Sequence, residues 1–162
     1  LVQLGLDVLP EGVAVGAESL HYLLMKTNSI VSRGIMREAS QMGLTSGQPK
    51  ILEFLREAQE ADQKTIAEHC EIEQATAGSI LMRMEEAELI HRRQRKGNRR
   101  SLYVSLTEKG MQAAENMQAV FDKTDELAAS ALTAEELEQL KQSLKKISLV
   151  LSDNNYERKT AK

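Results

Sequence analysis

The spacing of apolar residues changes near residue 88, and this change limits which folds the chain can adopt. Within residues 74–87, apolar residues recur every third or fourth position, which is the period of a helix with one buried face. From Leu102 to Leu106 they alternate with polar residues, which is the period of a half-buried strand. A helical pattern resumes after Thr107. The sequence therefore predicts a mainly α protein that contains a small β-hairpin.

Two short helices precede the change of period. Asp62 is a suitable N-cap for the first helix, which carries apolar residues up to Cys70. A tight turn at 71–74 leads into the second helix, which is expected to end near Ala87. The inner face of this second helix is predicted to consist of Ala77, Ile80, Leu81 and Met84. Two short helices joined by so tight a turn indicate a helix-turn-helix.

A basic hairpin is expected after the second helix. Leu89 and Ile90 begin one strand, 102–106 form the other, and 95–98 supply the turn, because Gly and Asn both adopt positive φ. The net charge of the chain is −3, yet the segment 91–100 contains no acidic residue and six basic ones: Arg92, Arg93, Arg95, Lys96, Arg99 and Arg100. Such a cluster suits contacts with phosphates, although taken alone it also fits a solvated charge run.

Longer helices are predicted on both sides of this region. An apolar stripe from Leu20 to about Ala39 predicts one helix that Gly43 closes, and 45–49 predict the capped start of the next. Thr107 is expected to cap a long helix whose inward side extends to Leu127 or Ala128. A capping box at 133–136 is expected to open the last helix.

The last helix carries a seam of apolar residues in steps of three and four. These candidate dimerisation residues are Leu137, Leu140, Leu144, Ile147 and Leu151. One helix cannot bury this seam together with Leu149 and Val150 against so small a domain. We therefore expect a second copy of the chain to cover it.

A helix-turn-helix followed by a basic hairpin predicts contact with double-stranded DNA. The second helix enters the major groove, and the hairpin reaches the flanking backbone or minor groove. Gln and Arg can each read a base edge with two hydrogen bonds, and small residues permit close approach. A surface helix without a ligand is the alternative, which gives the small residues no role. The candidate DNA-binding residues are Lys64, Gln74, Ala75, Thr76, Gly78, Ser79, Arg83, Arg95, Lys96, Asn98, Arg99 and Arg100.

Three segments of the chain resemble the multiple antibiotic resistance regulator (MarR) family. The matching residues are 64–70 (KTIAEHC), 76–90 (TAGSILMRMEEAELI) and 99–110 (RRSLYVSLTEKG), of which the last is the most specific. The resemblance covers about residues 20–151. It implies a homodimer whose first, fifth and sixth helices interlock. It also implies that the fourth helix enters the major groove and that Arg99 or Arg100 reaches the minor groove.

The resemblance has two further implications. Asn98 stands where the family commonly has an Asp that orients the wing arginine through a salt bridge, so Asn98 would supply only a weaker hydrogen bond. Many relatives bind a small-molecule effector in a crevice, which His21, Tyr22 and Met25 could border in this chain. Ordinary interface packing explains these three residues equally well.

Other classes of function find little support in the sequence. His21, His69 and His91 lack metal-ligand spacing, and no phosphate loop or catalytic motif occurs, so we expect no metal, no cofactor and no enzymatic activity. Cys70 lies on the apolar phase of its helix, which favours structural burial over redox sensing. The single cysteine and the lack of a membrane span or signal peptide predict a cytoplasmic protein.

The predicted fold is a winged helix-turn-helix with an α-helical dimerisation region. Residues 1–18 are expected to be an N-terminal arm of unknown role, 19–152 the regulator, and 153–162 a polar tail. Within the regulator, about 45–107 form the DNA-binding lobe, whereas 19–42 and 108–152 form the dimerisation helices. The predicted function is that of a sequence-specific transcriptional regulator, a homodimeric repressor of a palindromic operator with an effector of unknown identity. The alternative is a winged-helix protein-interaction module without specific DNA binding.

Overall fold

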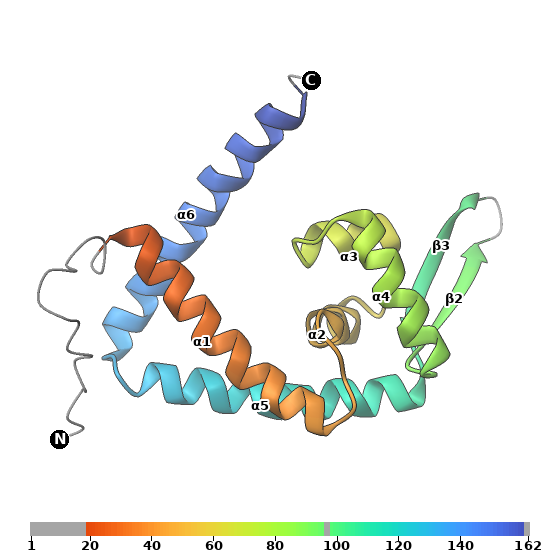
Figure 1. The fold of residues 1–162 in the computed structure, drawn as a ribbon, viewed down its shortest axis with the longest axis horizontal. Helices are drawn as coiled ribbons and strands as arrows, with labels where there is room; N and C mark the ends of the chain where they lie inside the picture. The colour runs from red at the N-terminus through yellow and green to blue at the C-terminus, as the bar shows by residue number, and fades with distance from the viewer. Residues whose placement is uncertain (1–18, 96–97, 161–162) are drawn as a thin grey trace, which may run out of the picture. The chain divides into compact units, whose positions relative to one another are not determined.

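A computed structural model describes residues 19–95 and 98–160. The side chains of 95–101 and 154–160 lie outside this description, as does the expected arm at 1–18. The chain divides into two compact units, which meet at Ser46 and Gly47 and are described in turn. The elements in chain order are α1 (Leu20–Gln41), α2 (Gln48–Ala58), β1 (Glu60–Asp62), α3 (Gln63–His69), α4 (Gln74–Glu86), β2 (Ile90–Arg95), β3 (Asn98–Leu106), α5 (Glu108–Ala129) and α6 (Ala134–Thr160) (Figure 1).

The described part of the first unit consists of α1 and the turn that follows it. The amides of Met42 and Gly43 donate to the carbonyls of Ala39 and Ser40 at 3.0 and 3.1 Å. Gly43 has a φ of +77°, which glycine adopts at little cost, so the helix ends where the sequence predicts. Several apolar side chains of α1 are exposed: Leu20, Tyr22, Leu23, Met25 and Ile30.

The core of the second unit is shared by four helices and the sheet. The α4 face that the sequence predicts to be inward is buried, and Ile66 of α3 is fully buried as well. This confirms the helical phases of the helix-turn-helix. The largest fully buried side chains are Ile51, Leu52, Leu55, Ile66, Leu81, Met84, Val104 and Met117.

The sheet has three antiparallel strands in the order β1–β3–β2. Figure 1 shows β2 and β3 as a hairpin beside α4. The hairpin of β2 and β3, hereafter the wing, was predicted, whereas β1 was not. A strand of three residues is too short to show a period. Val104 is fully buried but Leu102 is 41% exposed. The expected burial of this strand is therefore limited to its end nearest the core.

Three of the predicted helix caps are confirmed. Asp62 Oδ1 accepts from the Thr65 amide at 2.8 Å, and Thr107 Oγ1 accepts from the Gly110 amide at 2.9 Å. In the capping box, the Thr133 amide donates to Glu136 Oε2 at 2.8 Å. The Glu136 amide in turn donates to Thr133 Oγ1 at 3.2 Å. These side chains satisfy amides that have no partner within their helix.

The start of α2 differs from the expectation. Pro49 lies in the first turn as predicted, but the N-cap is Gly47, with no side-chain hydrogen bond and a φ of +86°. A Cβ at residue 47 would lie 2.5 Å from Cδ1 of Ile80. The positive φ therefore favours glycine at this position, and a Cβ here would also displace the end of the Ile80 side chain.

The C-terminal helix has no buried side chain among its described residues, 134–153. Leu127 and Ala128, at the end of α5, were expected to face inward but are exposed, Leu127 to 75%. α6 continues to Thr160, so the predicted polar tail begins inside the helix. None of the described helices is both long enough and apolar enough to cross a membrane.

Candidate nucleic-acid interface

The outward face of α4 carries most of the residues that the sequence predicts to read DNA. Gln74, Ala75, Thr76, Ser79 and Arg83 are all exposed. Their backbone is held rigidly, because the opposite face of the same helix lies in the core. The helix thus presents small and polar side chains from a fixed support, as insertion into a major groove requires.

Gly78 has a different environment from that expected. It is half-buried, and a Cβ at this position would lie 3.0 Å from Nε2 of Gln63 on α3. That amide nitrogen donates to the carbonyl of Gln74 at 3.1 Å. A side chain at residue 78 would therefore press against the end of Gln63, so the small size of this residue favours the close packing of α3 against α4.

The C-terminal end of α4 is tied to the start of α5 by side chains of the Leu-Thr-Glu-Lys-Gly segment. Lys109 Nζ donates to the carbonyl of Ala87 at 2.7 Å, and Thr107 Oγ1 donates to that of Glu88 at 2.7 Å. Ala87 is the C-cap residue of α4, so Lys109 satisfies a carbonyl that has no partner within the helix, and Thr107 binds the carbonyl that follows it. We refer to Thr107, Lys109 and Gly110 as the α4–α5 clasp.

Gly110 contributes to the clasp through its lack of a side chain. A Cβ at this position would lie 1.8 Å from the carbonyl oxygen of Leu89, far inside van der Waals contact. The Thr107 amide donates to that same oxygen at 3.1 Å. The segment that most specifically carries the family resemblance is therefore, in part, a device that fixes α4 relative to α5.

Two arginines at the base of the wing are paired with carboxylates from other elements. Arg92 donates to Oε2 of Glu85 on α4, through Nε at 2.8 Å and also through Nη2. Arg93 donates to Oε2 of Glu60 on β1, through Nε at 2.8 Å and Nη2 at 2.5 Å. The hydrogen bonds and charge of Arg92 lower the pKa of Glu85.

These ion pairs change the interpretation of the basic cluster at 91–100, because not all six of its cations are unpaired. Neighbouring residues of a strand point to opposite faces, so Arg92 fastens one face of the wing and Arg93 the other. The sequence showed six cations without an acid in 91–100, but the carboxylates that pair with Arg92 and Arg93 lie elsewhere in the chain. Two of the six are thus occupied within the protein.

The remaining predicted wing residues are only partly described. The backbones of Arg95 and Asn98 pair across the hairpin, with an irregularity between Gln94 and Arg95, which is consistent with the predicted turn. Lys96 lies outside the described residues. The same holds for the side chains of Arg95, Asn98, Arg99 and Arg100.

Lys64, the predicted contact on α3, is exposed. Its Nζ lies 3.7 Å from Oε1 of Glu68 one helical turn away, and both side chains are largely in solvent. Exposed pairs of this kind are weak, so Lys64 is available to a phosphate.

The cysteine environment agrees with the structural role predicted for it. Cys70 is 4% exposed, and its burial raises the pKa of the thiol, although Lys50 acts in the opposite direction. Phe54 and His69 stack nearby, with ring centroids 4.3 Å apart. In the described ranges, no group of three or more His, Cys, Asp or Glu side chains is placed to hold a metal ion.

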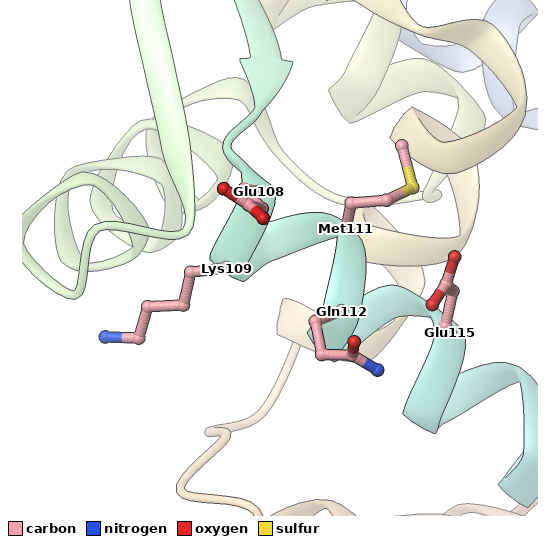
Figure 2. Close-up of a pocket in the computed structure, with 5 residues that line it drawn as sticks. All are labelled: Glu108, Lys109, Met111, Gln112 and Glu115. Atoms are coloured by element: carbon pink, nitrogen blue, oxygen red, sulfur yellow. The ribbon is translucent and has the colours of Figure 1, made fainter.

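A shallow open depression lies over the first turns of α5 (Figure 2). Figure 2 shows that the side chains around it point in different directions, with Lys109 turned away from the others. Its polar groups do not converge on a common point, so it has no feature of a ligand site. Its lining residues are Glu108, Lys109, Met111, Gln112 and Glu115.

The predicted dimerisation seam on α6 is poorly covered within one chain. Leu140, Leu144 and Leu151 are 45%, 40% and 56% exposed, and Leu137 and Ile147 are half-buried. Leu149 and Val150 are 66% and 61% exposed. Leu140, Leu144 and Leu151 thus form an apolar stripe along α6 that a single chain leaves uncovered.

Comparisons with known proteins agree with this geometry. The sequence model of the MarR family matches residues 44–102. The HTH-type transcriptional repressor Rv2887 of Mycobacterium tuberculosis is 25% identical over 128 residues, which are 79% of this chain and 92% of that protein.

Solved structures give the same picture. The crystal structure of the S. aureus MepR–DNA complex matches with a TM-score of 0.77 and 25% identity, over 82% of this chain and 98% of that one. The structure of Rv2887 in complex with salicylic acid matches with a TM-score of 0.62 and 25% identity, over 79% and 95% of the two chains. The predicted winged-helix fold is confirmed.

Proposed function

This chain carries a MarR family DNA-binding domain, and from that premise we propose that it is a cytoplasmic, homodimeric transcriptional repressor of a palindromic operator. The observation that carries the proposal is the outward face of α4, which is exposed, rich in small and polar residues, and held on both sides by the core and the clasp. A helix fixed in this way can read base edges without first becoming ordered, so less free energy is lost on binding.

Two groups of residues are proposed to contact DNA. Bases in the major groove are assigned to α4, where Gln74 and Arg83 can each make two hydrogen bonds to one base. Gly78 allows α4 to lie close to α3, and so acts on DNA only through the position of the helix. Phosphates and the minor groove are assigned to Lys64 and to the wing residues Arg95, Lys96, Asn98, Arg99 and Arg100.

Assembly as a dimer is supported by the uncovered seam of α6. Three of its leucines, Leu140, Leu144 and Leu151, are 40% to 56% exposed in one chain, and a two-fold axis would pair the same surface from two copies. Each copy would then present one α4. Two such helices would fit an inverted repeat with half-site centres about one helical turn apart.

An effector is supported by one relative, because Rv2887 has been solved with salicylic acid. In this chain, Lys26 Nζ lies 5.9 Å from the centre of the Tyr22 ring on α1, a cation beside an aromatic face. We propose that a small aromatic acid releases this protein from its operator. Titration of salicylate into the protein–DNA complex tests this, and an unchanged affinity at millimolar salicylate would refute it for that acid.

The proposed function is tested by selecting binding sites from random duplex DNA and then varying the salt. The double variant with Arg99→Ala and Arg100→Ala should bind every duplex more weakly. The slope of log affinity against log salt should fall by roughly 0.9 for each phosphate that a subunit no longer binds. Gln74→Ala should instead lose about 1–3 kcal/mol of discrimination at particular base pairs and retain the slope.

The matched control removes two adjacent cations from elsewhere. Lys145 and Lys146 are exposed on α6, so replacing both with alanine changes the charge equally but should leave the slope unchanged. If the selection yields no preferred duplex and the wing variant binds DNA like the parent, the proposed function is wrong. That outcome would favour the protein-interaction module.

A further inference from the structure

Met82 is an exposed apolar residue on the face of α4 that is proposed to enter the groove. The structure describes every residue of α4, and Met82, at 50% exposure, is its one large apolar side chain left in solvent. The other large apolar residues of this helix, Ile80, Leu81 and Met84, are buried. The sequence pattern alone does not single out Met82, because polar and small residues dominate this face.

The helical period places Met82 among the small residues of that face. Ala75, Ser79 and Met82 follow one another in steps of four and three, so they line one side of the helix. All three are exposed. Because Ala75 and Ser79 are short, Met82 is free to extend beyond the neighbouring surface.

The polar side chains near Met82 are partly engaged with their own helix. Ser79 Oγ donates to the carbonyl of Ala75 at 3.1 Å, and Arg83 Nε donates to the carbonyl of Ser79 at 3.3 Å. Both hydrogen bonds direct polar groups back along α4. The centre of the outward face is therefore more apolar than its composition suggests.

The major groove offers one apolar feature to such a surface, the C5-methyl group of thymine. Methionine is well suited to contact it, because its side chain is unbranched, flexible and polarisable. We propose that Met82 is a specificity-determining residue that reads a thymine methyl group in each half-site. This inference rests on the proposed function. It predicts that the base pairs in contact with the centre of α4 include an A·T pair in each half-site.

The test removes the methyl group from the DNA and the side chain from the protein. In the duplex preferred by the parent protein, each thymine is replaced in turn by deoxyuridine, which lacks only that methyl group. Removal of a contacted methyl group should weaken binding of the parent roughly fourfold per half-site, since burying one such group contributes about that factor. Substitution in both half-sites should weaken binding by roughly fifteen-fold.

Three variants distinguish a contact by Met82 from a general effect of deoxyuridine. Met82→Ala should bind the thymine and deoxyuridine duplexes equally well, whereas Met82→Leu should retain most of the preference for thymine. Met42→Ala is the control, because Met42 is similarly exposed, at 41%, but lies at the end of α1. It should respond to deoxyuridine like the parent.

The outcomes separate the inference from the function on which it rests. Sequence-specific binding that is insensitive to deoxyuridine at every position would overturn the role of Met82 and leave the proposed function intact. A Met82→Ala protein that is weakened by deoxyuridine as much as the parent would also overturn that role alone. The absence of any preferred duplex would overturn both, and a partner protein would then be the candidate for this face.

Discussion

Replacement of Gly110 by alanine tests the clasp that holds the recognition helix. The added Cβ would lie 1.8 Å from the Leu89 carbonyl oxygen, whereas real Cβ contacts are essentially never below 3.0 Å. The oxygen belongs to the backbone, so no side chain can move aside. The start of α5 must therefore retreat by more than about 1 Å.

That retreat stretches three hydrogen bonds, namely those that Thr107 and Lys109 donate to the carbonyls of residues 87–89, now 2.7 to 3.1 Å long. Each contributes about 1 kcal/mol net, and the strain of overpacking adds about 1–3 kcal/mol. The better helix propensity of alanine returns up to about 1 kcal/mol. We expect Gly110→Ala to lower the free energy of unfolding by about 3–5 kcal/mol, a large part of the stability of a typical domain.

Urea unfolding followed by circular dichroism, at fixed protein concentration, measures this loss. Gln112→Ala is the control, because it places the same side chain two residues away on an exposed part of α5 (Figure 2). It gives up one hydrogen bond of 3.3 Å to Asn116 and should change stability by less than about 0.5 kcal/mol. A Gly110→Ala protein within about 1 kcal/mol of the parent would show that the close approach of α5 to Leu89 is wrong.

Three further substitutions test assembly, capping and the thiol. Leu144→Asp should dissociate the proposed dimer, because two uncompensated carboxylates would be buried near the axis; light scattering of an intact dimer would exclude α6 from the interface. Asp62→Ala should lower stability by about 1 kcal/mol at neutral pH through loss of the α3 cap. The Thr65 hydrogen bond lowers the pKa of Asp62 below its ordinary value, so this carboxylate contributes its full stabilisation above that ordinary value. The difference between parent and variant in denaturant midpoints should therefore shrink as the pH falls through the folded-state pKa, and a constant difference would refute the linkage. Since burial raises the pKa of the Cys70 thiol and keeps it protonated, Cys70→Ser should leave DNA affinity in mild peroxide the same as that of the parent. Release of the parent alone by peroxide would contradict this.

Structural features that depend only on residues close together in the sequence, such as helix caps, were predictable. The caps at Asp62, Thr107 and Thr133 each act on an amide three residues ahead, so the signal is local. The buried phase of α4 likewise follows from its own periodicity. The exposure of the α6 seam was predictable as well, because so long an apolar seam cannot be buried against so small a domain.

Features that depend on residues far apart were not predictable. Arg93 meets Glu60 across 33 positions, and nothing in the basic segment reveals that partner. Gly110 needs its small size because the carbonyl oxygen of Leu89, in the segment between α4 and β2, lies against it. Gly78 was expected on the outward face of α4, and its closeness to Gln63 on α3 could not be identified without the fold.

Within this domain, the residues that hold α4 in place are different from the residues on its outward face. Gln63 holds the start of α4, the clasp holds its end, and the Arg92–Glu85 pair joins the helix to the wing. These groups fix the recognition helix and leave its outward face free. On that face Ala75, Ser79 and Met82 are suited to shape and methyl contacts more than to dense hydrogen bonding.

The charge distribution follows the same division. A chain of net charge −3 gains little from general attraction to DNA, so its affinity must come from a few well-placed cations. With Arg92 and Arg93 paired with Glu85 and Glu60, we propose that phosphate contact by the wing falls mainly to its four other basic residues. Removal of Arg99 and Arg100 would take half of these, so the salt dependence of that variant measures how much of the affinity these two residues supply.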